Sequence, residues 1–186
     1  MSREVTFRDP EQFMVSKVEP SRRTNIAMEN NMKKPTFKPK LGQIDYTNAR
    51  WAPVMNCVLK YKNKILVVQR SKELIFYPGY WNGVSGFLDD QRSLNQKVAD
   101  EVREELGISK TKIKKIHLGE IFDQEEPKYA KIWIVHPVLV EVKTDKVKLD
   151  WEARNYKWVT LKEAKRLKLL PGFDEVLKRL SPWIQK

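Results

Sequence analysis

The chain has 186 residues, 41% of them hydrophobic and 32% charged, which is typical of one globular domain with room for an extension. Its formal net charge of +12 favours polyanions such as nucleotides, nucleic acid or an anionic surface, without choosing among them. No apolar run reaches the roughly 18 residues of a membrane-spanning helix, and the single cysteine, Cys57, excludes an intrachain disulfide and a cysteine metal cluster. The first 20 residues lack the apolar segment of a secretory signal, so we expect a cytoplasmic protein.

Residues 1–50 differ in pattern from the rest of the chain. They contain four prolines, and no helical or strand periodicity persists through them. Proline and polar residues favour loops over regular elements. We therefore predict an N-terminal extension over 1–50, irregular or partly ordered, followed by a folded domain over 51–186.

Two apolar runs, 54–61 and 65–69, open the folded domain, and the three polar residues between them predict a β-hairpin. A turn-rich loop follows over 77–83. A helix is then predicted from Ser93 to Leu106, because Ser93 and Gln96 have the spacing of a capping box and Gly107 suits a helix end. Its apolar stripe recurs at four-residue steps, at Leu94, Val98, Val102 and Leu106.

Strands and helices alternate through the remainder of the chain. Strands are predicted over 113–122, 132–142 and 156–159, and helices over 161–167 and 173–180. Pro137 indicates a bulge or an edge in the second of these strands. Mixed strands with helices before and after them favour an α/β sandwich over a helical bundle.

Three acidic residues lie on the predicted helix at positions that share a face: Glu101, Glu104 and Glu105. They project beside the apolar stripe, at the boundary between core and solvent. Like charges at this spacing repel one another, whereas a divalent cation such as Mg²⁺ is bound by carboxylate oxygens. The alternative is a solvated helix face with Lys97 and Arg103 as ionic partners.

Two glycines precede this helix, and they predict a turn at which backbone approaches a ligand closely. Gly83 and Gly86 lie before the helix N-terminus, where a pyrophosphate is favoured. Arg70 ends the preceding strand and is a candidate phosphate contact. We therefore expect Arg70, Gly83 and Gly86 to bind substrate, although a tight bend and a surface ion pair would also explain them.

The predicted helix and the segment before it resemble a known sequence motif. The segment 86–108, GFLDDQRSLNQKVADEVREELGI, resembles the Nudix box, G-x5-E-x7-R-E-U-x-E-E-x-G-U, in which U is aliphatic. The residues in register are Gly86, Glu101, Val102, Glu104, Glu105, Gly107 and Ile108. The resemblance covers about 51–182 and implies a Nudix-type α/β/α sandwich with a mixed sheet.

Two box positions depart from the pattern. Arg92 replaces the first box glutamate, and Asp100 replaces the box arginine that in this family helps to orient the catalytic glutamate. An aspartate cannot perform that task. Because the two changes together reverse both charges, we predict an ion pair between Arg92 and Asp100.

The resemblance implies Mg²⁺-dependent hydrolysis of a nucleoside diphosphate linked to another moiety, with Mn²⁺ as an alternative cation. Glu101 and Glu105 are the favoured metal ligands, and Glu104 is a third ligand or aligns the catalytic water. The general base is a box glutamate or an acid from a later loop, the candidates being Glu120, Glu125, Glu126 and Glu152.

Two other functions are compatible with the same resemblance. A Nudix module that binds a nucleotide or RNA without turnover is favoured by the missing box arginine and opposed by the intact glutamates. An isopentenyl-diphosphate isomerase would need a catalytic cysteine in a context that Cys57 lacks. A phosphorylated small molecule or nucleotide is the expected partner; RNA and a homodimer remain open, and no membrane is expected.

Overall fold

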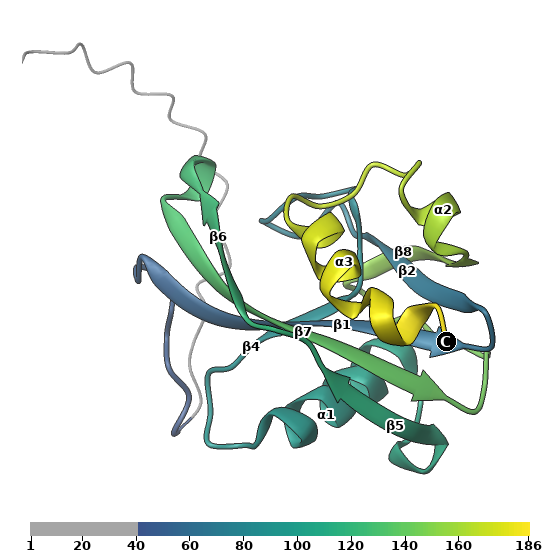
Figure 1. The fold of residues 1–186 in the computed structure, drawn as a ribbon. Helices are drawn as coiled ribbons and strands as arrows, with labels where there is room; N and C mark the ends of the chain where they lie inside the picture. The colour runs from purple at the N-terminus through teal and green to yellow at the C-terminus, as the bar shows by residue number, and fades with distance from the viewer. Residues whose placement is uncertain (1–40) are drawn as a thin grey trace, which may run out of the picture. The chain divides into compact units, whose positions relative to one another are not determined.

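A mixed β-sheet with helices on both faces makes up residues 41–186, the part of the chain that the computed structural model describes (Figure 1). Strand β1 (Trp51–Tyr61) lies in its middle. It runs parallel to β7 (Lys131–Val142) on one side and antiparallel to β2 (Lys64–Arg70) and β4 (Val84–Phe87) on the other. The other strands within 41–186 are β3 (Trp81–Asn82), β5 (Ile113–Leu118), β6 (Phe122–Glu126) and β8 (Ala153–Val159).

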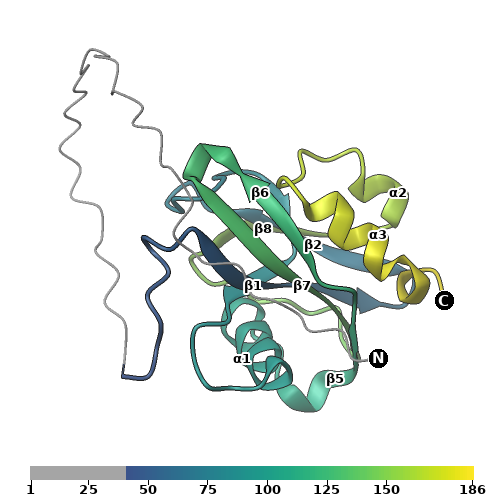
Figure 2. The same ribbon diagram turned by 60° about the vertical axis from the view of Figure 1, so that its left-hand side comes forward.

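The helices divide between the two faces of the sheet. Helix α1 (Leu94–Leu106) covers one face, and α2 (Leu161–Ala164) with α3 (Phe173–Ile184) covers the other (Figures 1 and 2). Short 3₁₀ turns lie at Lys110–Lys112 and Pro127–Tyr129. This arrangement confirms the predicted α/β/α sandwich. Within residues 41–186, no helix combines the length and apolarity needed to cross a bilayer.

Strand β1 supplies both hydrophobic cores, because successive side chains of a strand point to opposite faces. The core on the α1 face includes Met55, Cys57, Leu59, Val98, Val102 and Leu106. The core on the α3 face includes Val58, Ile65, Val67, Phe173, Leu177 and Leu180. Burial of each such large apolar side chain stabilises the fold by roughly 1.5–3 kcal/mol, and this shared core packs α1 against β1.

The predicted hairpin and central helix are both present. Strands β1 and β2 pair through a tight turn in which Lys62 has a positive φ of 53°. At the start of α1, the Ser93 hydroxyl accepts from the backbone of Gln96, whose side chain accepts from the backbone of Ser93. Gly107 ends the helix with a φ of 65°, a left-handed conformation that glycine adopts without steric cost.

The prediction of one strand over 113–122 is wrong, because β7 changes its antiparallel partner halfway along. Strand β6 pairs with the first half of β7 and β5 pairs with the second half. Between them the N–H of Gly119 donates to the carbonyl of Pro137 at 2.8 Å. Pro137 lies inside a continuous β7 rather than at a bulge or an edge, and its missing N–H falls where that ladder is already interrupted.

The predicted glycine turn is also wrong. Gly83 lies between β3 and β4, Gly86 lies within β4, and neither has a positive φ. The chain is extended here because β4 pairs with β1. Three elements differ only at their ends: the helix predicted over 161–167 ends at Ala164, the helix over 173–180 continues to Ile184, and the strand over 156–159 begins at Ala153.

Residues 41–50 form neither helix nor strand and pack against the loop that precedes α1. The backbone N–H of Ile44 donates to the carbonyl of Asp89 at 2.6 Å, and the Gln43 amide donates to the Asp89 carboxylate at 2.6 Å. The Lys131 ammonium donates to backbone carbonyls of the same segment, including that of Tyr46 at 2.6 Å. The rest of the predicted extension, 1–40, lies outside the described residues.

Candidate active site

Helix α1 presents three charged residues at four-residue steps along one edge of its buried face: Lys97, Glu101 and Glu105. Lys97 and Glu105 are buried, and the side chain of Glu101 is 18% exposed. Glu104 lies outside this row, with a side chain that is 59% exposed and 3.0 Å from Arg103. The structure therefore places two of the three predicted glutamates at the core boundary and leaves the third on the solvent side.

Gly86 explains how the Glu101 carboxylate fits beside the sheet. A Cβ added to Gly86 would lie 2.7 Å from Oε1 of Glu101 and 2.9 Å from its Cδ. Gly83 is confined differently, because a Cβ there would meet the backbone carbonyl of Cys57. Gly86 thus makes room for a site carboxylate, whereas Gly83 makes room for the neighbouring strand.

Glu105 has a buried oxygen with no partner. Within residues 41–186 its Oε1 makes no hydrogen bond, although the side chain is almost fully buried. Burial raises the pKa of Glu105 well above its ordinary value, and the nearby charges of Glu152, Glu101 and Asp150 raise it further. An unsatisfied buried carboxylate is costly, and a bound cation would offset that cost.

Arg70 lies near these acids, at the end of β2. Its Nε donates to the carbonyl of Phe76 at 2.8 Å, which closes the loop that follows β2. Burial lowers the pKa of its guanidinium, and the charges of Glu152 and Glu105 oppose that shift. Arg70 thus provides positive charge beside the acids and also holds the loop, so part of its hydrogen-bonding capacity is already used.

The predicted ion pair between the two departing box positions is present. Nη1 of Arg92 lies 2.7 Å from Oδ2 of Asp100, and the guanidinium also contacts the Asp90 carboxylate. These hydrogen bonds raise the pKa of Arg92, and the contact with Arg92 lowers that of Asp90. Asp100 is thereby held by Arg92, with Arg103 a further 3.5 Å contact.

A buried lysine occupies the centre of the acidic network. Nζ of Lys97 lies 3.1 Å from Asp89, 3.3 Å from Glu101 and 3.6 Å from Asp90. Burial lowers the pKa of Lys97, but these carboxylates outweigh it and the pKa stays above its ordinary value. The sequence predicted Lys97 only as an ionic partner on a solvated helix face, and it gave no prediction for Asp89. The position of Lys97, four residues before Glu101, was the signal in the sequence for their contact.

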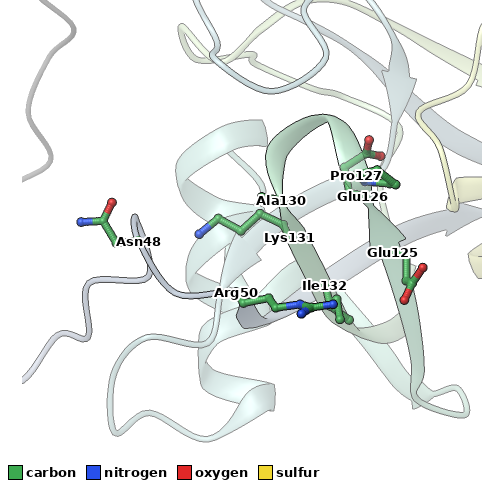
Figure 3. Close-up of a pocket in the computed structure, with 8 residues that line it drawn as sticks. All are labelled: Asn48, Arg50, Glu125, Glu126, Pro127, Ala130, Lys131 and Ile132. Atoms are coloured by element: carbon green, nitrogen blue, oxygen red, sulfur yellow. The ribbon is translucent and has the colours of Figure 1, made fainter. Parts of the chain in front are cut away.

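Among the candidate bases, Glu152 lies at the site. Its pKa is raised by burial and by the charges of Asp150 and Glu101. Glu120 instead contacts Arg179 at 3.0 Å and is 85% exposed. Glu125 and Glu126 line a separate cavity of about 460 Å³ at the end of the β6–β7 hairpin, with Asn48, Arg50 and Lys131 on its other walls (Figure 3).

The acids only partly form a cation site. Within residues 41–186, no three His, Cys, Asp or Glu side chains are arranged as a complete metal-binding group. The unpartnered Oε1 of Glu105 and the neighbouring Glu101 and Glu152 nevertheless supply hard oxygen donors, which suit Mg²⁺ or Mn²⁺. Mg²⁺ commonly uses one or two protein carboxylates and completes its shell with water and substrate phosphate, so the residues fit such an ion.

Solved structures with the same fold come from several organisms. The MutT protein from Methanosarcina mazei Go1 is 23% identical, with a TM-score of 0.57, and the match covers 75% of this chain and 99% of that chain. A C. elegans Ap4A hydrolase in a binary complex is 23% identical, with a TM-score of 0.56, covering 74% and 98%. The NUDIX domain of Shewanella oneidensis NrtR, in complex with ADP ribose, is 16% identical, with a TM-score of 0.60, covering 72% and 88%.

The sequence itself matches the family model described as the NUDIX domain over residues 50–183. No curated protein sequence matches the chain. The family match includes the whole sheet, the acidic helix α1 and nearly all of α3. Because it spans most of the chain, this protein belongs to the Nudix family.

Proposed function

We propose that this protein is a Mg²⁺-dependent pyrophosphohydrolase that cleaves a nucleoside diphosphate linked to another moiety, with Mn²⁺ able to replace Mg²⁺. The observation that carries this proposal is the buried, unpartnered Oε1 of Glu105 beside Glu101 and Glu152. A carboxylate buried without a partner is costly, and a bound cation would offset that cost.

Glu101 and Glu105 would hold the cation, and Glu104 would reach it only from the solvent side, through water or substrate. When bound, the ion would neutralise the diphosphate and make its phosphorus more electrophilic. Water would attack that phosphorus, the bridging P–O bond would break, and the water proton would pass to a carboxylate. Glu152 suits that last role, because burial raises its pKa and so increases its affinity for a proton.

Substrate charge fits the basic character of the chain. The net charge of +12 favours polyanions, and Arg70 places a cation beside the acids. The Ap4A hydrolase and the ADP-ribose-bound NUDIX domain that share this fold make dinucleoside polyphosphates and ADP-ribose reasonable first substrates to assay. The cytoplasm, where such nucleotides are abundant, is the proposed compartment, and RNA caps belong in the same assay.

The test is a substrate panel with Mg²⁺, comprising nucleoside triphosphates, dinucleoside polyphosphates, ADP-ribose, nucleotide sugars and capped RNA. Glu101→Gln and Glu105→Gln should each lower kcat by about 100-fold or more, and Glu104→Gln by less. Glu120→Gln, which alters an exposed acid elsewhere, is the matched control. Full activity in both Glu104→Gln and Glu105→Gln would show that the site is assigned wrongly.

The missing box arginine favours a second candidate function, a nucleotide- or RNA-binding module without turnover. Asp100 is paired with Arg92 and gives no cationic support to Glu101. Retained ligand binding with no Mg²⁺-dependent product from any panel member would establish this alternative.

A further inference from the structure

We propose that Lys97 is the positioning residue for Glu101 in this protein, supplying from one helical turn earlier the cationic support that the Nudix box takes from the arginine replaced here by Asp100. This inference rests on the proposed function, because it assigns a partner to one of its metal-binding carboxylates. It concerns a residue at a box position that the family pattern leaves unspecified.

Two features lie close to Oε1 of Glu101. One is Gly86, where an added Cβ would lie 2.7 Å from that oxygen. The other is Nζ of Lys97, 3.3 Å from the same oxygen. Both contacts restrict where the Glu101 carboxylate can lie.

The side chain of Lys97 is itself held in place. Its side chain is only 7% exposed, and its ammonium contacts the Asp89 carboxylate at 3.1 Å. The Asp89 carboxylate also accepts from the Gln43 amide, and its carbonyl accepts from the N–H of Ile44. Because Asp89 is anchored by the segment before β1, the lysine has little freedom, and it transmits that restriction to Glu101.

Asp100 cannot perform this task. Its carboxylate faces Arg92 at 2.7 Å and Arg103 at 3.5 Å. A second negative charge next to Glu101 would repel it, and these arginines neutralise that charge. The reversed pair leaves Glu101 without the box arginine, and Lys97 is the cation that contacts its carboxylate, at 3.3 Å.

The contact is tested first in the metal-free protein, by a double-mutant cycle on the full chain in EDTA. Lys97→Met, Glu101→Gln and the double variant are compared by urea unfolding. If Lys97 holds Glu101, Lys97→Met should change the unfolding constant at least about threefold more in the wild-type background than in Glu101→Gln. Strict additivity would overturn the proposal. Lys178→Met, which removes an exposed helix ion pair on α3, is the control.

The consequence for turnover is tested with Mg²⁺ and the panel substrate of highest kcat/KM. Lys97→Met should lower kcat by about 10- to 100-fold with KM changed less than about threefold. Adding Arg92→Glu and Asp100→Arg, which restores the charge order of the box, should recover most of that loss. A lysine with only a structural role would give no such recovery. Two results would refute the positioning role: unchanged kcat in Lys97→Met, or no recovery of kcat in the variant that carries all three substitutions. Absence of turnover in the wild-type protein would instead refute the proposed function.

Discussion

Gly86 and Glu101 lie so close together that even a methyl group on the glycine would reach Oε1 of the glutamate, at 2.7 Å. The two residues are 15 positions apart and are brought together because β4 pairs with β1 while α1 packs across the same strand. The position of the Glu101 carboxylate therefore depends on the absence of a side chain at Gly86.

Gly86→Ala should therefore impair function more than folding. The clashing atoms belong to the end of a flexible side chain, so Glu101 can move away at a cost to stability of about 1 kcal/mol or less. The displaced carboxylate should lower kcat by about 10-fold or more. Steady-state kinetics and chemical denaturation measure the two effects.

Gly83→Ala is the matched comparison. Its Cβ would meet the backbone carbonyl of Cys57, which cannot move without disturbing β1. We expect a loss of about 1–3 kcal/mol in the free energy of unfolding, with kcat per folded molecule little changed. If one of the two variants lost more than the other in both stability and kcat, this distinction would be contradicted.

Glu105→Gln should stabilise the metal-free protein while it lowers kcat by about 100-fold or more. Burial raises the pKa of Glu105, so the folded state binds its proton more tightly than the unfolded state does. The charged carboxylate therefore destabilises the fold above that pKa, and the penalty shrinks as the pH falls below it, until it vanishes below the pKa of the unfolded state. At pH 7–8 the substitution should raise the free energy of unfolding by about 1–2 kcal/mol. If the gain in unfolding free energy of Glu105→Gln increased as the pH fell, this explanation would be refuted.

Binding of Mg²⁺ should weaken on acidification above the pH at which an ordinary glutamate titrates. Burial raises the pKa values of Glu101, Glu105 and Glu152, and their protons must leave before a cation can bind. Isothermal titration calorimetry between pH 4 and 8 should place the midpoint above the ordinary value of 4.5. Glu104→Gln changes an exposed acid and should leave that midpoint in place; a midpoint at or below 4.5 would contradict the role of burial.

The Arg92–Asp100 ion pair should contribute little to stability. Both side chains are about a third exposed, and water screens such pairs. A double-mutant cycle with Arg92→Ala and Asp100→Ala should give a coupling energy of about 0.2–1 kcal/mol, which falls at high salt. Complete additivity would show that the two residues do not interact in solution.

The sequence contained enough local information to predict helix α1. Four-residue apolar spacing, the capping pair of Ser93 and Gln96, and Gly107 at the end all act within a few residues of one another, so no tertiary contact was needed. The register with the Nudix box then predicted the fold, which the family match confirms. The Arg92–Asp100 pair was predictable too, because opposite charges had been exchanged at two linked positions.

Other elements depended on contacts distant in sequence. The strand predicted over 113–122 divides in two because β7 exchanges partners at Pro137, a residue that local rules assigned to a bulge or an edge. Gly83 and Gly86 were predicted to form a turn, since glycine alone does not reveal whether it permits an unusual φ or a close approach.

The sequence by itself determined that three glutamates follow one another on a capped helix behind a glycine-containing segment. Only the tertiary structure decided which of them is buried and what each one faces. Glu105 is buried beside Glu152, nearly 50 residues later, while Glu104 remains in solvent. Lys97 lies inside the acidic network because Asp89 is anchored from the segment before β1. Helical spacing fixes which residues share a face, but the burial and charge of that face depend on the strands and loops that pack against it.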